Sequence, residues 1–135
     1  GQGRQHWHRA DIFILGVSRC GKTPLSMYLA LQGYKTANLP LVLGIEPPQE
    51  VFTLDRKKMV GLTIDIVQLM MHRRARQQRI GMGKGKSEYT DPENLDEELQ
   101  SALRFYRRLN IPTVEVTNKP IEETAQEILE EVSVS

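Results

Sequence analysis

The chain has 135 residues, of which 39% are apolar and 26% charged, and its formal net charge is +1. This length supports one folded domain, and the composition is that of a soluble globular protein rather than a disordered one. No apolar run reaches the roughly 20 residues that a membrane helix needs. The balanced charge argues against a dedicated nucleic-acid binder, and a single cysteine excludes an internal disulfide framework. We therefore expect neither membrane nor nucleic acid as a partner, and a reducing compartment such as the cytoplasm.

The first half of the chain alternates strand and helix patterns. Residues 1–10 show no periodicity, so we interpret them as a linker or expression remnant that precedes a folded domain over residues 11–135. An almost continuous apolar run at 11–17 predicts a strand buried on both faces. Residues 23–32 follow a helical pattern that ends at Gly33, a typical C-terminal cap. A second strand is predicted at 37–43, where Pro40 favours an edge position.

The rest of the chain continues this alternation. We expect a strand at 60–64, an arginine-rich helix at 66–79 and a flexible glycine-rich stretch at 80–87. Asp91 and Pro92 open a helix with one apolar stripe, since proline suits the first helical position. A strand at 113–116 and a helix from Ile121 complete the order. The pattern predicts an α/β fold, a three-layer P-loop kinase-like domain whose mostly parallel central sheet is flanked by helices.

The turn after the first strand matches G-x-x-x-x-G-K-[ST] without gaps, and a helix follows it, as this motif requires. Backbone N–H groups of such a loop surround a phosphate at a helix N-terminus. Lys22 would carry charge to the terminal phosphates, and the Thr23 hydroxyl would ligate Mg²⁺. Arg19 would reach a phosphate or pair with an acid, and Cys20 is interpreted as a small filler. The predicted phosphate-binding residues are Gly16, Val17, Ser18, Arg19, Cys20, Gly21, Lys22 and Thr23.

Three other features were considered as partners of this loop. Asp65, at the end of a predicted strand, would hold Mg²⁺ or accept a proton, or would only cap the next helix. Arg73 and Arg76 share one helix face, where they would either close over phosphates or form a solvated surface. Asn118 and Lys119 resemble the guanine-reading N-K-x-D motif of GTPases, but Ile121 replaces its aspartate. A regulatory GTPase is therefore not predicted.

The run Gly-Val-Ser-Arg-Cys-Gly-Lys-Thr-Pro-Leu-Ser-Met-Tyr-Leu-Ala from Gly16 to Ala30 is more specific than the bare motif. It resembles the family of pyruvate, phosphate dikinase regulatory proteins and phosphoenolpyruvate synthase regulatory proteins. The resemblance extends over most of the span from Ile12 to Leu129. Its further matches are Ala37-Asn38-x-Pro40, Gly61-Leu62-Thr63-Ile64-Asp65, Arg73, Arg76, Ser87-x-Tyr89, Val116-Thr117 and Ile121-Glu122-Glu123-Thr124-Ala125.

The resemblance implies a bifunctional enzyme that acts on a dikinase or synthase whose catalytic histidine is phosphorylated. Such proteins phosphorylate a threonine of the target with ADP, giving AMP, and remove that phosphate with inorganic phosphate, giving pyrophosphate. Family members also commonly dimerise, so a homodimer is expected. The location implied is the cytoplasm, or the chloroplast stroma in a plant.

Carried over to this chain, the resemblance places ADP on the loop Gly16–Thr23 and makes Asp65 a general base or metal organiser. Arg73 and Arg76 would contact the transferring phosphate. This sequence departs from the family at Cys20, where threonine or serine is common, and at Ile66, where proline is common. An ATP-dependent small-molecule P-loop kinase and a non-catalytic nucleotide sensor remain the alternatives.

Overall fold

A computed structural model describes residues 7–17, 20, 22–79 and 91–132, with the side chains of 76–79 outside that description. Its centre is a four-stranded sheet of order β2-β1-β3-β4 in which every pairing is parallel. The strands are β1 (Ile12–Val17), β2 (Thr36–Leu41), β3 (Met59–Thr63) and β4 (Thr113–Glu115). The predicted α/β class is confirmed, and the sheet is parallel throughout.

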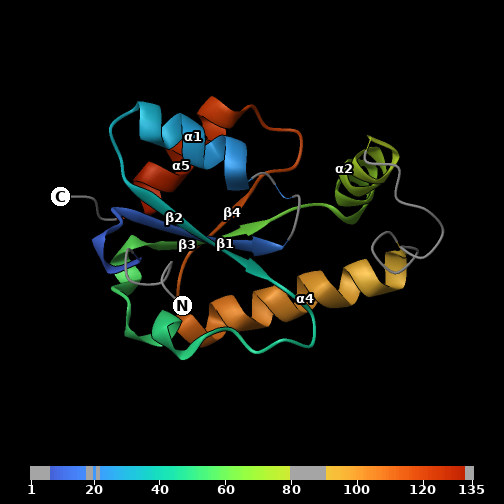
Figure 1. The fold of residues 1–135 in the computed structure, drawn as a ribbon, viewed down its shortest axis with the longest axis horizontal. Coiled ribbons are helices and arrows are strands. Elements are labelled where there is room, and N and C mark those ends of the chain that lie inside the picture. The colour runs from blue at the N-terminus through green and yellow to red at the C-terminus, as the bar shows by residue number, and fades with distance from the viewer. Residues whose placement is uncertain (1–6, 18–19, 21, 80–90, 133–135) are drawn as a thin grey trace.

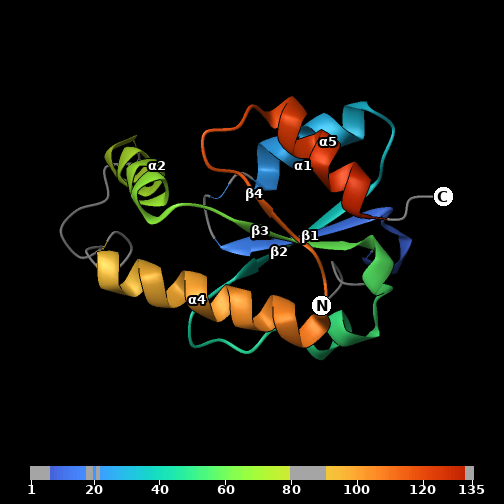
Figure 2. The same ribbon diagram turned by 180° about the vertical axis from the view of Figure 1, so that it is seen from behind.

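Helices cover both faces of this sheet, which gives the three layers (Figures 1 and 2). On one face α1 (Lys22–Leu31) lies beside α5 (Ile121–Glu131), and on the other α4 (Pro92–Leu109) runs under the strands. The remaining helix, α2 (Ile66–Arg79), lies beyond the end of β3. All six residues of β1 are buried because strands flank it and helices cover it, which explains its continuous apolar sequence.

The ends of α4 illustrate how local sequence determines these elements. Asp91 caps the first turn, where its Oδ1 accepts a hydrogen bond from the N–H of Glu93 at 3.4 Å, and Pro92 follows at the first helical position. At the other end Asn110 takes a left-handed conformation, with φ of 56°. The predicted helix start is therefore confirmed, whereas the expected flexible stretch at 80–87 lies outside the described residues.

Two parts of the chain differ from the sequence expectation. Trp7 is buried and meets the Phe13 ring edge-on, with 5.0 Å between ring centroids, and Ala10 is buried as well. The folded part therefore includes residues 7–10, which the sequence analysis assigned to a linker, because an aromatic side chain there has a core partner. Between β2 and β3 the chain also forms two short 3₁₀ helices, η2 (Gln49–Thr53) and η3 (Arg56–Lys58), which were not predicted.

Candidate functional site

The strand order places a topological switch point at the carboxyl edge of the sheet, where open α/β sheets have their ligand-binding crevice. From β1 the chain crosses over α1 to β2 on one side, and from β3 it crosses over α2 and α4 to β4 on the other. Adjacent strands whose connections leave in opposite directions form a topological switch point, where ligands of open α/β sheets bind. The predicted phosphate loop leaves the carboxyl end of β1, and Asp65 follows the carboxyl end of β3. The fold thus brings the two predicted features to the same edge.

Lys22 is the first residue of α1 and is 8% exposed. Its ammonium Nζ donates a hydrogen bond to the carbonyl oxygen of Val17 at 2.6 Å and lies 3.9 Å from Cys20 Sγ. The cation is thus held against the loop that it belongs to. The Thr23 side chain is exposed in the first turn of the helix, whereas Ser18, Arg19 and Gly21 lie outside the described residues. Phosphate and Mg²⁺ binding by this loop stays a prediction.

Close packing at the start of the loop explains Gly16. A Cβ atom at this position would lie 2.6 Å from Cys20 Sγ and 3.4 Å from the Cβ of Leu62, so a larger residue would displace the loop. Cys20 itself is 1% exposed. Burial raises the pKa of its thiol, because the charged thiolate loses solvation, although the Lys22 ammonium acts in the opposite direction. The interpretation of Cys20 as a filler residue agrees with this burial.

Asp65 caps α2. Its Oδ2 accepts hydrogen bonds from the backbone N–H groups of Val67 at 3.0 Å and Gln68 at 3.3 Å. The helix-capping role expected as one alternative for Asp65 is therefore confirmed. The side chain is exposed, and among the described residues no group donates to its second oxygen, Oδ1. One carboxylate oxygen therefore orients the side chain while the other faces solvent, which is compatible with both roles at once.

The loop after β4 holds Asp65 in place. Thr117 Oγ1 accepts a hydrogen bond from the Asp65 N–H at 2.8 Å and donates one to Glu115 Oε2 at 3.0 Å. Asn118, with φ of 54°, donates its N–H to Gln68 Oε1 at 2.9 Å. Sequence reasoning found no role for Thr117, because nothing local connects it to Asp65. Lys119 is engaged by Glu127, whose Oε2 lies 2.8 Å from its Nζ.

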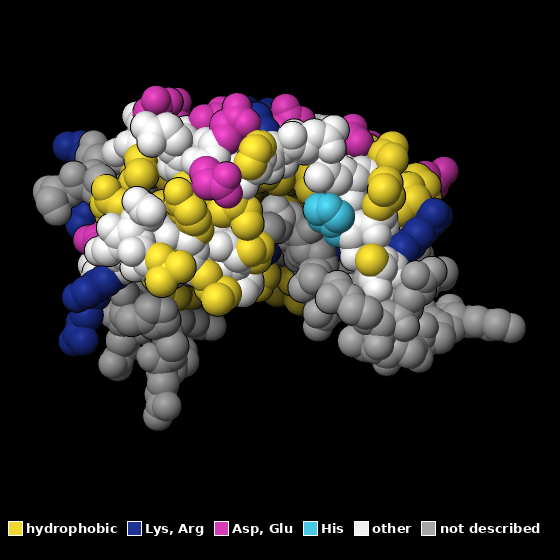
Figure 3. Space-filling view, turned by 90° about the horizontal axis from the view of Figure 1, so that it is seen from above, with side chains coloured by type: hydrophobic (Ala, Val, Ile, Leu, Met, Phe, Trp, Pro, Cys, Tyr) yellow, Lys and Arg dark blue, Asp and Glu magenta, His cyan; other side chains and the backbone are white. Residues whose placement is uncertain are grey.

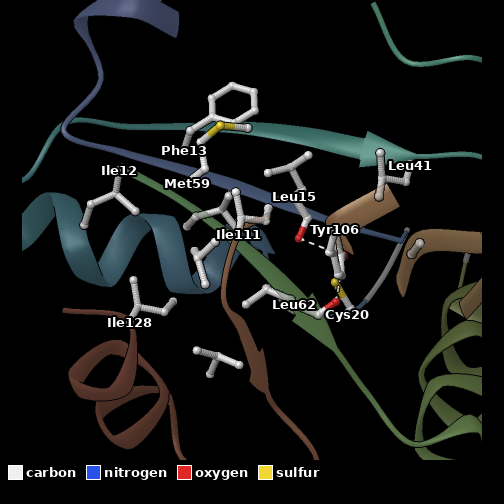
Figure 4. Packing of buried hydrophobic residues seen from close by; sticks show 14 of the residues in the cluster. Ile12, Phe13, Leu15, Cys20, Leu41, Met59, Leu62, Tyr106, Ile111 and Ile128 are labelled. Carbon is white, nitrogen blue, oxygen red and sulfur yellow. Dashed lines mark hydrogen bonds between the residues drawn. The ribbon is translucent and has the colours of Figure 1, made fainter. Parts of the chain in front are cut away.

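Tyr106 of α4 fastens the two strands that border the crevice. Its side chain is 1% exposed, and its hydroxyl donates to the carbonyl oxygens of Leu62 at 2.8 Å and Leu15 at 3.3 Å. Figure 4 shows the phenol between these strands, close to Cys20. The ring lies over Gly61, where a Cβ would come within 2.6 Å of three ring carbons. Since the pairing of β1 with β3 ends at Leu15 and Gly61, the hydroxyl joins the strands where they separate.

Arg73 is 2% exposed, and its Nη2 lies 2.6 Å from Glu98 Oε2 of α4. This ion pair joins α2 to α4, so the arginine is neither a solvated surface residue nor presented openly to the crevice. Its predicted contact with phosphate stays a prediction. Arg76 belongs to the same helix, but its side chain is outside the described residues.

Three further observations concern the described residues outside these contacts. Seen from the side of α1 and α5, acidic side chains gather along one border of the face, beside α5, whose sequence carries five glutamates (Figure 3). Among the described residues there is no group of three or more histidine, cysteine, aspartate or glutamate residues that would hold a metal. Within the same part of the chain, no helix combines the length and apolar content needed to cross a bilayer.

Comparison with known proteins adds the evolutionary context. A model of the family described as kinase/pyrophosphorylase matches residues 1–129. Pyruvate, phosphate dikinase regulatory proteins of Geotalea daltonii and Geobacter sulfurreducens are 47% and 46% identical over 130 and 135 residues, 96% and 98% of this chain. A chloroplastic protein of the same description from Oryza sativa is 47% identical over 122 residues, 90% of this chain and 26% of its own length. The chain spans about half the length of the bacterial relatives, 48% and 49%.

Proposed function

The chain belongs to the kinase/pyrophosphorylase family, and we propose that it carries the nucleotide site of a bifunctional regulator of pyruvate, phosphate dikinase or phosphoenolpyruvate synthase. The regulator phosphorylates a threonine of its target with ADP and removes the phosphate with inorganic phosphate. The observation that carries this proposal is the placement of Lys22 and Asp65 after the two strands that border the switch point. The relatives named after this role support the choice of target.

In the kinase direction, the threonine oxygen attacks the β-phosphorus of ADP. A new P–O bond forms, the bond from the β-phosphorus to the bridging oxygen breaks, and AMP leaves with that electron pair. The threonine proton passes to the Asp65 carboxylate, whose Oδ2 is fixed by the helix cap. Lys22 would exchange the Val17 carbonyl for the terminal phosphate and neutralise charge there.

In the reverse direction, an oxygen of inorganic phosphate attacks the phosphorus of phosphothreonine. The bond from phosphorus to the threonine oxygen breaks, pyrophosphate forms, and the threonine oxygen regains a proton that Asp65 has taken from the attacking hydrogen phosphate. Thr23 would hold Mg²⁺ directly, and Asp65 would hold it through a water so that its carboxylate stays able to accept a proton; the ion neutralises phosphate charge when bound. The Thr23 hydroxyl and the Asp65 carboxylate are both exposed at the crevice, and hydroxyl and carboxylate oxygens are suitable ligands for this ion. The compartment proposed is that of the target, the cytoplasm or, in a plant, the chloroplast stroma.

The proposal is tested by following phosphate from β-labelled ADP to threonine of a histidine-phosphorylated dikinase. The full-length protein is assayed as wild type, Lys22→Ala and Lys57→Ala, the last being an exposed lysine on η3. We expect Lys22→Ala to lower the rate by about 10²–10³, as when a charge-stabilising group is lost, and Lys57→Ala to leave it unchanged. Transfer from ATP but not ADP, or onto a metabolite instead of the protein, would reject the proposal.

A further inference from the structure

A groove of about 770 Å³ lies between α4 and residues 39–48, the segment that ends β2 and continues beyond it. Ala102 and Phe105 of α4 and Leu41 of β2 form its buried apolar floor. Val42 and Ile45 line it as well, although they are 49% and 65% exposed. Exposed apolar side chains beside a cavity of this size are typical of a binding surface.

The wall formed by residues 42–48 is preorganised. The N–H of Ile45 donates to the carbonyl oxygen of Val42 at 3.1 Å, which closes a turn, and Pro47 and Pro48 restrict the chain that follows. A surface that is already ordered loses little conformational entropy when a flexible segment binds to it. The groove therefore suits an occupant that is itself extended and flexible.

One positively charged side chain of the groove, Arg104, is not compensated by an ion pair among the described residues. Four ionisable side chains line the groove, Glu46, Glu98, Arg104 and Arg108, and three of them take part in ion pairs that neutralise their charge. Arg108 lies 3.5 Å from Glu46 and over the Phe52 ring, at 5.2 Å from its centroid, while Glu98 binds Arg73. Arg104 is exposed and makes no ion pair with any described residue. The occupant that complements these charges carries an anionic group beside an apolar one.

The groove begins at the nucleotide site. Its floor residue Leu41 pairs in the sheet with Val17, which ends β1 and is part of the predicted phosphate loop, and neighbouring strands lie about 4.8 Å apart. Glu98, another lining residue, binds Arg73 of α2, the helix that Asp65 caps. A segment that occupied the groove would therefore reach the crevice between Lys22 and Asp65.

We infer that this groove binds the extended segment of the target protein that carries the acceptor threonine, with an apolar side chain against Ala102 and Phe105 and an anionic side chain against Arg104. This inference rests on the proposed function, which requires a protein segment to reach the phosphate loop. The anionic group is a carboxylate or a phosphoryl group of the same segment. Both are recognised by a guanidinium through paired N–H···O contacts.

The test measures binding of the full-length protein to immobilised target by surface plasmon resonance. The variants are Arg104→Glu and Ile45→Asp, both at exposed positions. Arg107→Glu is the matched charge control, since this exposed arginine of α4 does not line the groove, and Leu31→Asp is the apolar control on α1, where Leu31 is 87% exposed. We expect both groove variants to weaken target binding at least about tenfold, with controls within about twofold.

Two further measurements make the result specific. ADP affinity should be unchanged in all four variants, and the groove variants should raise KM for the target while kcat is largely kept. Phosphatase treatment of the target distinguishes the two sources of the anion. If the anion is a phosphoryl group, the wild-type protein should bind the treated target as weakly as Arg104→Glu binds the untreated one. If it is a carboxylate, the treatment should leave binding unchanged. If both groove variants bind the target like wild type, the inference is overturned, and a lowered unfolding temperature would then assign the groove to a contact within the longer protein. Binding through the groove without threonine phosphorylation would instead reject the proposed function alone.

Discussion

Replacing Gly61 with alanine tests how rigidly Tyr106 is held between the strands. The new Cβ would lie 2.6 Å from the Cδ1, Cδ2 and Cε1 atoms of the ring. The ring has little freedom to withdraw, because it is 1% exposed and its hydroxyl is bound to the carbonyl oxygens of Leu15 and Leu62. Overpacking of this kind costs about 3 kcal/mol at the upper end of its usual range. Alanine recovers about 0.4–1 kcal/mol by restricting the unfolded chain, so we expect a net loss of about 2 kcal/mol.

The assay is urea unfolding followed by the fluorescence of Trp7, the only tryptophan, which packs on Phe13 in the core. With a denaturant slope of about 2 kcal/mol per molar, the midpoint should fall by about 1 M. The double variant Gly61→Ala with Tyr106→Leu should lose less than the sum of the single losses, because the smaller side chain leaves room for the methyl group. A loss below about 0.5 kcal/mol in Gly61→Ala, or strict additivity in the double variant, would refute this account of the packing.

Asp65→Ala should cost about 1 kcal/mol in urea unfolding, because a helix cap is lost, whereas Asp65→Asn keeps the cap. Both variants should lose threonine phosphorylation, and activity retained by Asp65→Asn would show that the negative charge is not needed. Burial raises the pKa of Cys20 and Tyr106 above their ordinary values of 9.0 and 10.0. As the pH rises, the unfolded chain therefore releases these protons at a lower pH than the folded chain does. The free energy of unfolding should keep its highest value below about pH 9 and fall as the pH rises further. In Tyr106→Phe, the free energy of unfolding should fall less steeply above about pH 10 than in the wild type. A wild-type free energy of unfolding that stays constant from about pH 8 to about pH 10.5 would contradict the prediction.

Much of the fold could be predicted because each signal was local. The strand at Met59–Thr63 is a short apolar run that ends before a capping aspartate, and α2 spans Ile66–Arg79 as expected. The short helix Gln49–Thr53 has too few residues to show a period and was missed. Trp7 was assigned to the linker at residues 1–10, because nothing in the local sequence shows that it is buried. It is a core residue because its ring packs on Phe13 in the folded chain.

In the candidate site, too, the residues marked by a local pattern could be predicted, whereas roles that depend on distant contacts could not. Lys22 and Asp65 were found from the sequence because motif and strand ends fix their positions along the chain. Arg73 was predicted as a site residue, but its burial against Glu98 was not predicted. It lies in a run of arginines, and the sequence alone does not show which of them is buried. Tyr106 lies on the apolar stripe predicted for the helix that begins at Pro92, where the pattern gives it no role beyond packing. Its role depends on carbonyl groups that lie 91 and 44 residues away in the sequence, and no local pattern reports such a contact.

That separation has a consequence for how the chain acquires activity. Contacts between distant residues form late in folding, because the intervening chain must be ordered before they are gained. The first strand and the phosphate loop leave the ribosome long before Tyr106, so a partly synthesised chain lacks the bond that joins the crevice strands. The predicted phosphate loop and the completed core thus form together. If the loop binds ADP as we propose, an unfinished or misfolded chain would have no site from which to transfer phosphate, and ADP binding would report complete folding.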